Sequence, residues 1–153
     1  MKKINISGNE EVKVIEVKEP LDGEECLLPL FLESVSAGFP SPAEDYLEGK
    51  LDLNKFLIKN PSATFFVRVT GDSMINAGIY SGDILVVDRA LTPKDGSIVI
   101  AVIDSELVVK RMQYIKKKIY LIPENAGFEK IEISKEMNFE VWGVVTTVIH
   151  SVL

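Results

Sequence analysis

The sequence contains few of the residues that build metal centres and the commonest nucleophilic sites. Among its 153 residues there is one cysteine, Cys26, and one histidine, His150. A single cysteine cannot form a disulfide within the chain, so nothing favours an oxidising compartment, and we expect a cytoplasmic protein. One histidine and one cysteine predict no metal centre and no bound cofactor. The histidine stands in a Val/Ile-rich run, where a structural role is typical, and this disfavours a Ser-His-Asp triad.

Positive charge and long apolar runs are also scarce. The net charge is −6, and the one basic cluster, the lysines at 116–118, separates two strand-like runs as the tip of a solvated hairpin would. Tight, direct binding to nucleic acid requires clustered Lys and Arg, so that class of function is disfavoured. No run approaches the roughly eighteen apolar residues of a membrane span, which predicts that the protein does not act in a membrane.

From residue 64 onward the pattern of apolar residues favours β-strands. Short β-branched and aromatic runs alternate with turn signals rich in Gly, Pro, Asp and Asn. This spacing predicts a mostly β protein with a compact, mainly antiparallel β domain. The expected strands cover residues 64–70, 83–88, 97–103, 106–114, 118–122, 129–133 and 139–149.

The segments before this domain indicate less regular structure. Residues 43–60 carry apolar residues at helical spacing, broken near Gly49, and Asp52 is placed to cap a second helical piece. A short helical segment is therefore expected there. Residues 1–20 are charged, with valines among Glu and Lys, and are compatible with a weak edge strand or with disorder.

Between these segments lies an unusual junction, Ala37-Gly38-Phe39-Pro40-Ser41-Pro42-Ala43. Its two prolines restrict themselves and the residues before them to extended conformations. An exposed, extended peptide fits two interpretations, a linker or a segment shaped to lie in a protease cleft.

Ser73 is the candidate nucleophile. The apolar run at 64–70 stops at Gly71, and Ser73 follows two residues later, before a new regular element can begin. A serine at a strand end is most often a turn residue or a helix cap. A catalytic role requires a base, and with histidine disfavoured the remaining base for a serine is lysine.

Lys110 is the candidate base. Strand alternation places it on the same face as Val108 and Met112, with Arg111 on the other face. A free lysine has a pKa near 10.4, so a lysine base at neutral pH needs a pKa lower by about three, which burial on an apolar face can supply. The alternative is a lysine whose ammonium group reaches water. Spacing alone leaves both interpretations open.

With Ser73, Lys110 and the Ala37-Gly38 junction together, the sequence resembles the LexA/UmuD superfamily of self-cleaving Ser-Lys proteases, and its UmuD members most closely. The resemblance covers residues 28–148, and the separation of 37 positions between the serine and the lysine is similar to the family's spacing. The matching motifs are Gly38-Phe39-Pro40-Ser41-Pro42-Ala43, Asp52-Leu53-Asn54, Pro61-Ser62-Ala63-Thr64, Gly71-Asp72-Ser73-Met74, Gly82-Asp83, Asp88, Val109-Lys110 and Pro123-Glu124-Asn125.

The resemblance implies a fold of the LexA/UmuD C-terminal type and a mechanism. Residues 1–37 would be an extended N-terminal arm removed on self-cleavage, and residues 38–153 a Ser-Lys peptidase-like β domain. Lys110 would take the proton of Ser73, which attacks the carbonyl of Ala37 and releases Gly38. The backbone N–H groups of Ser73 and Asp72 would bind the oxyanion.

The resemblance also implies partners. The protein would be a homodimer that cleaves itself when stimulated by a RecA filament on single-stranded DNA. The shortened form would be an accessory subunit of a Y-family translesion DNA polymerase, with a UmuC-like catalytic subunit. The 37 residues before the junction are too few and too acidic for a helix-turn-helix domain, which favours this role over a LexA-like repressor component. A non-cleaving dimeric binding module of the same fold stays open as an alternative.

Overall fold

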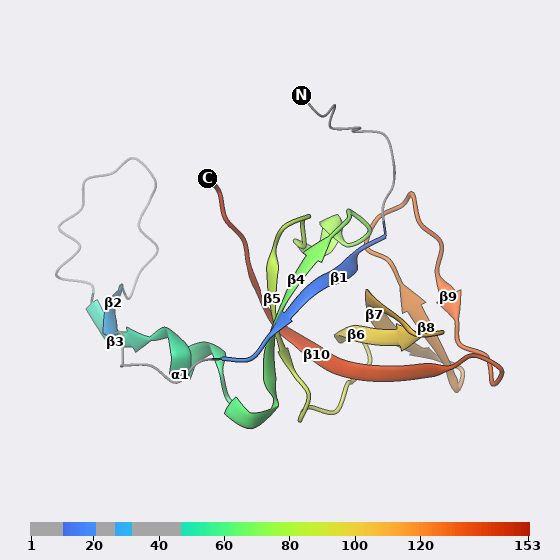
Figure 1. Cartoon of the computed structure of the whole chain (residues 1–153), viewed down its shortest axis with the longest axis horizontal. Coiled ribbons are helices and arrows are strands. Elements are labelled where there is room, and N and C mark those ends of the chain that lie inside the picture. Colours follow the sequence, from blue (N-terminus) through green and yellow to red (C-terminus); the bar gives the residue numbers. More distant parts are fainter. Residues whose placement is uncertain (1–10, 21–26, 32–46) are drawn as a thin grey trace. The chain divides into compact units, whose positions relative to one another are not determined.

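The computed structural model describes residues 11–20, 27–31 and 47–153 (Figure 1). The predicted cleavage site, Ala37 and Gly38, lies outside the described residues, as does Cys26. The chain divides into two compact units, one formed by Met1–Pro20 with Asn60–Leu153 and the other by Leu21–Lys59. The larger unit holds both Ser73 and Lys110, so the dyad prediction can be followed within it.

An antiparallel sheet forms the larger unit. In the described part of this unit eight strands pair in the order β1-β4-β5-β10-β6-β7-β8-β9, and Figure 1 shows β1 running beside β4. A further pairing of β1 with β7 closes the strands from β1 to β7 in this order into a barrel. The strands are β1 (Lys13–Lys18), β4 (Thr64–Thr70), β5 (Ile84–Asp88), β6 (Ile98–Ile103), β7 (Glu106–Ile115), β8 (Lys118–Ile122), β9 (Ile131–Glu132) and β10 (Phe139–Ile149).

The expected strands are confirmed, with shifts of one or two residues at some ends. The basic cluster also lies where the pattern indicated, because Lys116 and Lys117 form the exposed turn between β7 and β8. Both have left-handed backbone angles, with φ of 50° and 65°. The mostly β, mainly antiparallel fold predicted from the sequence is therefore correct.

The barrel encloses a core of β-branched and aliphatic side chains. One cluster includes Val67 and Val69 of β4, Met74 just after that strand, and Val12, which stands immediately before β1. Val12 has no exposed area, so the N-terminal segment contributes to the core and does not merely lie on the surface. Burying a valine side chain stabilises a fold by about 1.5–3 kcal/mol, which anchors this end of β1. Of the two alternatives for residues 1–20, the structure therefore shows a strand over Lys13–Lys18.

The smaller unit contains the strand pair β2 (Leu27–Phe31) and β3 (Leu47–Asp52), followed by helix α1 (Leu53–Leu57). Asp52 caps this helix, as predicted, by accepting a hydrogen bond from the Asn54 backbone N–H at 3.0 Å. The helix expected over residues 43–60 is wrong for 47–52, which form β3. Leu47, Gly49 and Leu51 also fit a period of two, and pairing with the apolar β2 outweighs the weak helical spacing.

Two short 3₁₀ helices, η2 (Pro61–Ala63) and η3 (Ile75–Ala77), flank β4 in the larger unit. No helix among the described residues is long and apolar enough to cross a membrane.

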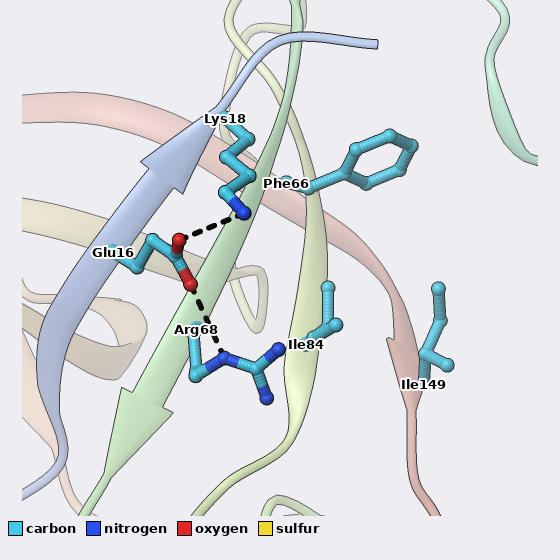
Figure 2. Close-up of a pocket in the computed structure, with 6 residues that line it drawn as sticks. All are labelled: Glu16, Lys18, Phe66, Arg68, Ile84 and Ile149. Carbon is cyan, nitrogen blue, oxygen red and sulfur yellow. Dashed lines mark hydrogen bonds and ion pairs between the residues drawn. The ribbon is translucent and has the colours of Figure 1, made fainter. Parts of the chain in front are cut away.

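A shallow apolar pocket of about 280 Å³ lies over β1, β4, β5 and β10 (Figure 2). At its edge Arg68 and Lys18 both contact the carboxylate of Glu16, at 3.3 Å and 2.9 Å. The hydrogen bond from Lys18 and that from Arg68 hold the pKa of Glu16 below its usual range. Neither Ser73 nor Lys110 lines this pocket, whose lining residues are Glu16, Lys18, Phe66, Arg68, Ile84 and Ile149.

Candidate active site

Ser73 lies in the short connection between β4 and η3. The backbone turns at Gly71, whose φ of 100° falls in the left-handed region that favours glycine. After this turn, η3 begins at Ile75. Ser73 has no exposed area, so it differs from the solvated serine that is common in turns.

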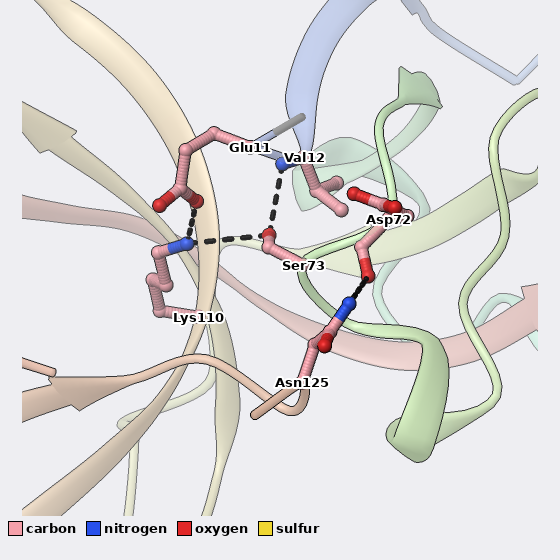
Figure 3. A network of polar contacts seen from close by, with 6 residues as sticks. All are labelled: Glu11, Val12, Asp72, Ser73, Lys110 and Asn125. Atoms are coloured by element: carbon pink, nitrogen blue, oxygen red, sulfur yellow. Dashed lines mark hydrogen bonds and ion pairs between the residues drawn. The ribbon is translucent and has the colours of Figure 1, made fainter. Parts of the chain in front are cut away.

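Lys110 lies in the middle of β7, opposite Val99 of β6. It is 1% exposed, and its strand-face neighbours Val108 and Met112 are buried, so the apolar face predicted from alternation is confirmed. The Nζ atom of Lys110 lies 3.3 Å from the Oγ atom of Ser73, within hydrogen-bond distance (Figure 3). The structure thus brings the two predicted residues together inside the protein.

A neighbouring loop fixes the peptide groups on both sides of Ser73. The side-chain amide of Asn125 donates to the Asp72 carbonyl at 2.9 Å (Figure 3), and the Glu124 N–H donates to the Ser73 carbonyl at 2.8 Å. The Asp72 carbonyl and the Ser73 N–H belong to one planar peptide group, so fixing the first also orients the second. Arg111, on the outer face of β7, forms an ion pair with Glu124 and ties this loop to the strand that carries Lys110.

The N-terminal segment contributes two contacts that the sequence did not indicate. Figure 3 shows Glu11 and Val12 facing the dyad from the N-terminal ribbon. The Glu11 carboxylate forms an ion pair with the Lys110 ammonium group, and the Val12 N–H donates to Ser73 Oγ at 2.9 Å. These residues lie 99 and 61 positions from their partners in the chain, too far for any local pattern to signal.

An open hollow of about 390 Å³ lies beside the loop of Glu124 and Asn125 that fixes Ser73. Phe128 lines it and lies with its ring centroid 5.8 Å from Lys110 Nζ, a distance compatible with a cation–π contact. The lining residues of the hollow are Asn76, Ile122, Pro123, Glu124, Asn125, Ala126, Phe128 and Lys130.

Among the described residues, the other titratable side chains do not form a second active site or a metal site. His150 Nδ1 lies 2.6 Å from the buried carboxylate of Asp83, which also accepts from the Tyr80 N–H at 2.8 Å. No group of three or more His, Cys, Asp or Glu side chains capable of holding a metal ion occurs within the described ranges. The histidine is therefore engaged in a structural contact.

Comparison with known proteins identifies the family. Residues 29–146 match the model of the Peptidase S24-like family. Protein SamA of Salmonella typhimurium is 50% identical over 122 residues, covering 80% of this chain and 84% of that protein. Protein ImpA of Escherichia coli is 47% identical over 132 residues, covering 86% and 90%. Protein MucA of Escherichia coli is 44% identical over 127 residues, covering 82% and 84%.

The matched region contains β4, β7 and the loop of Asn125, and so includes every element that carries the Ser73–Lys110 pair. It begins after β1, however, so the segment that covers the dyad lies outside it. The chain belongs to the Peptidase S24-like family, the LexA/UmuD type that its sequence resembles.

Proposed function

We propose that this chain is a UmuD-like SOS mutagenesis protein that cleaves its own Ala37-Gly38 bond. Ser73 is the nucleophile and Lys110 the general base. The observation that carries this proposal is the pair itself, with Lys110 Nζ 3.3 Å from Ser73 Oγ at a site where both side chains are buried. Removal from water disfavours the charged form of an amine, and a lysine base requires the neutral form.

The chemistry proceeds in two steps. Neutral Lys110 takes the Ser73 hydroxyl proton while Oγ bonds to the carbonyl carbon of Ala37, and the oxyanion is stabilised by the backbone N–H groups of Ser73 and Asp72. The C–N bond then breaks, and Lys110 passes its proton to the amine of Gly38. Water, deprotonated by the same lysine, hydrolyses the resulting ester and frees residues 1–37.

We expect a single, slow self-cleavage and not turnover on outside substrates. A peptide bond enters at high effective concentration when it belongs to the same chain or the partner subunit. In the SOS role, a RecA filament on single-stranded DNA would stimulate cleavage. The shortened homodimer would then serve a Y-family translesion polymerase. The net charge of −6 fits a protein that meets DNA through such partners and not directly.

The experiment is incubation of the purified protein at neutral and alkaline pH, followed by intact-mass spectrometry. We expect a fragment that begins at Gly38 and forms faster at alkaline pH, where more lysine is neutral. Ser73→Ala and Lys110→Met should abolish the fragment. The matched controls Ser134→Ala and Lys118→Met alter an exposed serine and an exposed lysine of the same domain and should cleave normally. Cleavage of Ser73→Ala at the normal rate would refute the mechanism.

One observation favours a second function, a non-cleaving dimeric binding module. Ser73 has no exposed area and its Oγ already accepts a hydrogen bond from Val12, so the dyad is closed in this structure. If no fragment forms under any condition while the protein still binds a translesion polymerase, the module is the correct description. A fragment that begins at Gly38 would support the self-cleaving protease and exclude the non-cleaving module.

A further inference from the structure

We infer that the segment comprising Glu11, Val12 and β1 is an internal ligand of the active site, which must leave before the Ala37-Gly38 bond can enter. This inference rests on the proposed self-cleavage and adds a regulatory segment to it. The segment, called here the covering segment (residues 11–18), lies outside the family match at 29–146.

Steric exclusion is the first argument. A scissile carbonyl carbon must approach Ser73 Oγ to about 3–3.5 Å for attack. The Val12 nitrogen already lies 2.9 Å from that oxygen, and no part of Ser73 is exposed. The position of Val12 and that of a substrate peptide group are therefore mutually exclusive.

Charge is the second argument. The Glu11 carboxylate forms an ion pair with the side-chain amine of Lys110, the group that must receive the Ser73 proton. An amine held by a carboxylate is not free to serve the nucleophile. The covering segment therefore occupies both members of the dyad, the nucleophile with a backbone N–H and the base with a carboxylate.

The binding of the covering segment is extensive. β1 pairs with β4 from Lys13 opposite Thr70 to Lys18 opposite Phe66, and the Val109 N–H contacts the Val12 carbonyl at 3.4 Å. Arg68 holds Glu16 at the exposed face of the same strand. The contacts of the covering segment therefore define the kind of ligand that binds here: an extended peptide with an acidic side chain at Lys110 and a small apolar side chain in the core.

Cleavage should then depend on the fraction of molecules in which the covering segment is displaced. Replacing Glu11 by Gln removes the ion pair to Lys110 but leaves β1 and its pairing to β4 unchanged. A charged hydrogen bond of this kind corresponds to about tenfold or more in an equilibrium. Glu11→Gln should therefore raise the self-cleavage rate by about tenfold. The control Glu132→Gln, which removes an exposed ion pair to Lys118 away from the covering segment, should leave the rate unchanged.

A reversible lock tests displacement directly. Lys13 and Thr70 are antiparallel partners, so Lys13→Cys with Thr70→Cys, in a Cys26→Ser background, can form a cross-strand disulfide beside Val12. The oxidised protein should cleave at least about tenfold more slowly than the same protein after reduction. Equal rates in the two forms would overturn the inference, because cleavage would then occur with the covering segment fixed in place.

A readout independent of cleavage separates this inference from the proposed function. In a Ser73→Cys, Cys26→Ser background, alkylation of Cys at position 73 by iodoacetamide reports access to the site. Glu11→Gln should raise the alkylation rate by about tenfold, and the control Glu132→Gln should not. If alkylation responds in this way but no variant cleaves itself, the inference about the covering segment is supported and the proposed self-cleavage is refuted. If Glu11→Gln and Glu132→Gln are alkylated at the same rate, the inference about the covering segment is refuted whatever the cleavage assay shows.

Discussion

Asn125 is predicted to position the nucleophile without touching the substrate. Its side-chain amide donates to the Asp72 carbonyl at 2.9 Å, and its side-chain oxygen accepts from the Gly127 N–H at 3.1 Å. Asn125→Asp keeps an oxygen for Gly127 but loses the donor to Asp72. Asn125→Ala loses both. The two variants therefore separate the orientation of the Ser73 peptide from the shape of the loop.

The expected cost in stability is modest. A hydrogen bond between neutral groups contributes about 0.5–1.5 kcal/mol, and the Asp72 carbonyl retains the Ile75 N–H at 3.3 Å as a second donor. The free energy of unfolding should thus fall by about 1 kcal/mol in Asn125→Asp. A domain with at least about 5 kcal/mol of stability would remain about 99.9% folded, so unfolding cannot account for a large loss of activity.

The expected cost in cleavage is larger. When the Asp72 carbonyl loses its side-chain donor, the peptide group that carries the Ser73 N–H can rotate, and both the oxyanion donor and Oγ lose their alignment. We expect a fall of about tenfold or more in the self-cleavage rate of both variants. Urea unfolding measures the stability, and the fragment beginning at Gly38 measures the rate at alkaline pH. The exposed Asn138→Ala serves as the control.

One pattern of results would refute this reasoning. If Asn125→Asp loses the expected stability but cleaves at the normal rate, the bond to Asp72 supports only the loop, and Ser73 is oriented by other contacts. The Glu124 N–H, which donates to the Ser73 carbonyl, would then be the more important constraint. A rate loss in Asn125→Ala alone would point to the Gly127 contact instead.

Three further predictions concern stability and assembly. Gly143→Ala should lower the melting temperature through a loss of about 1–3 kcal/mol, because a Cβ there would lie 2.5 Å from Val87 Cγ1 in the tightly paired sheet. A calorimetric scan with an unchanged transition would contradict this. The contacts of Glu16 lower its pKa in the folded protein below the usual value of 4.5. They therefore stabilise the fold at pH values above 4.5, and this stabilisation is lost as the pH falls through the folded-state pKa. The difference in urea midpoint between the native protein and Glu16→Gln should therefore be present at pH 7 and shrink in acid. After cleavage, residues 1–37 should remain bound through β1 and co-elute with the larger fragment in gel filtration until denaturant is added, since Val12 is part of the core. Immediate separation in native buffer would show that β1 contributes little.

Much of the fold follows from local pattern. The strands β4, β8 and β10 begin and end at the predicted residues because β-branched runs there are bounded by clear turn residues. The alternation of side chains along β7 also predicted correctly that Lys110 lies on the buried face of that strand. The helix prediction over residues 47–52 failed because its helical spacing was weak and its pairing partner, β2, lies about twenty residues earlier in the sequence.

Only those site residues that a local sequence pattern singles out could be predicted. Ser73 and Lys110 each stand at a position that strand punctuation or alternation singles out. Glu11 and Val12 reach them only because β1 closes the barrel between β4 and β7, and no spacing in the sequence encodes that contact. Asn125 stood within a recognised motif, but its role depends on the direction of its amide, which only the structure supplies.

The covering segment also bears on why such a dyad would act once. In this structure the burial of Ser73 and Lys110 depends in part on Glu11 and Val12, which belong to the piece that cleavage at Ala37-Gly38 would detach. Residues 1–37 stay bound through β1 until another molecule displaces them, and once they leave, no scissile bond takes their place and water enters beside Lys110. The product would then have lost both its substrate and the dry environment of its base. On this argument the shortened protein is a poor protease, and its vacated β4 edge and apolar core face become a surface that another extended segment can cover.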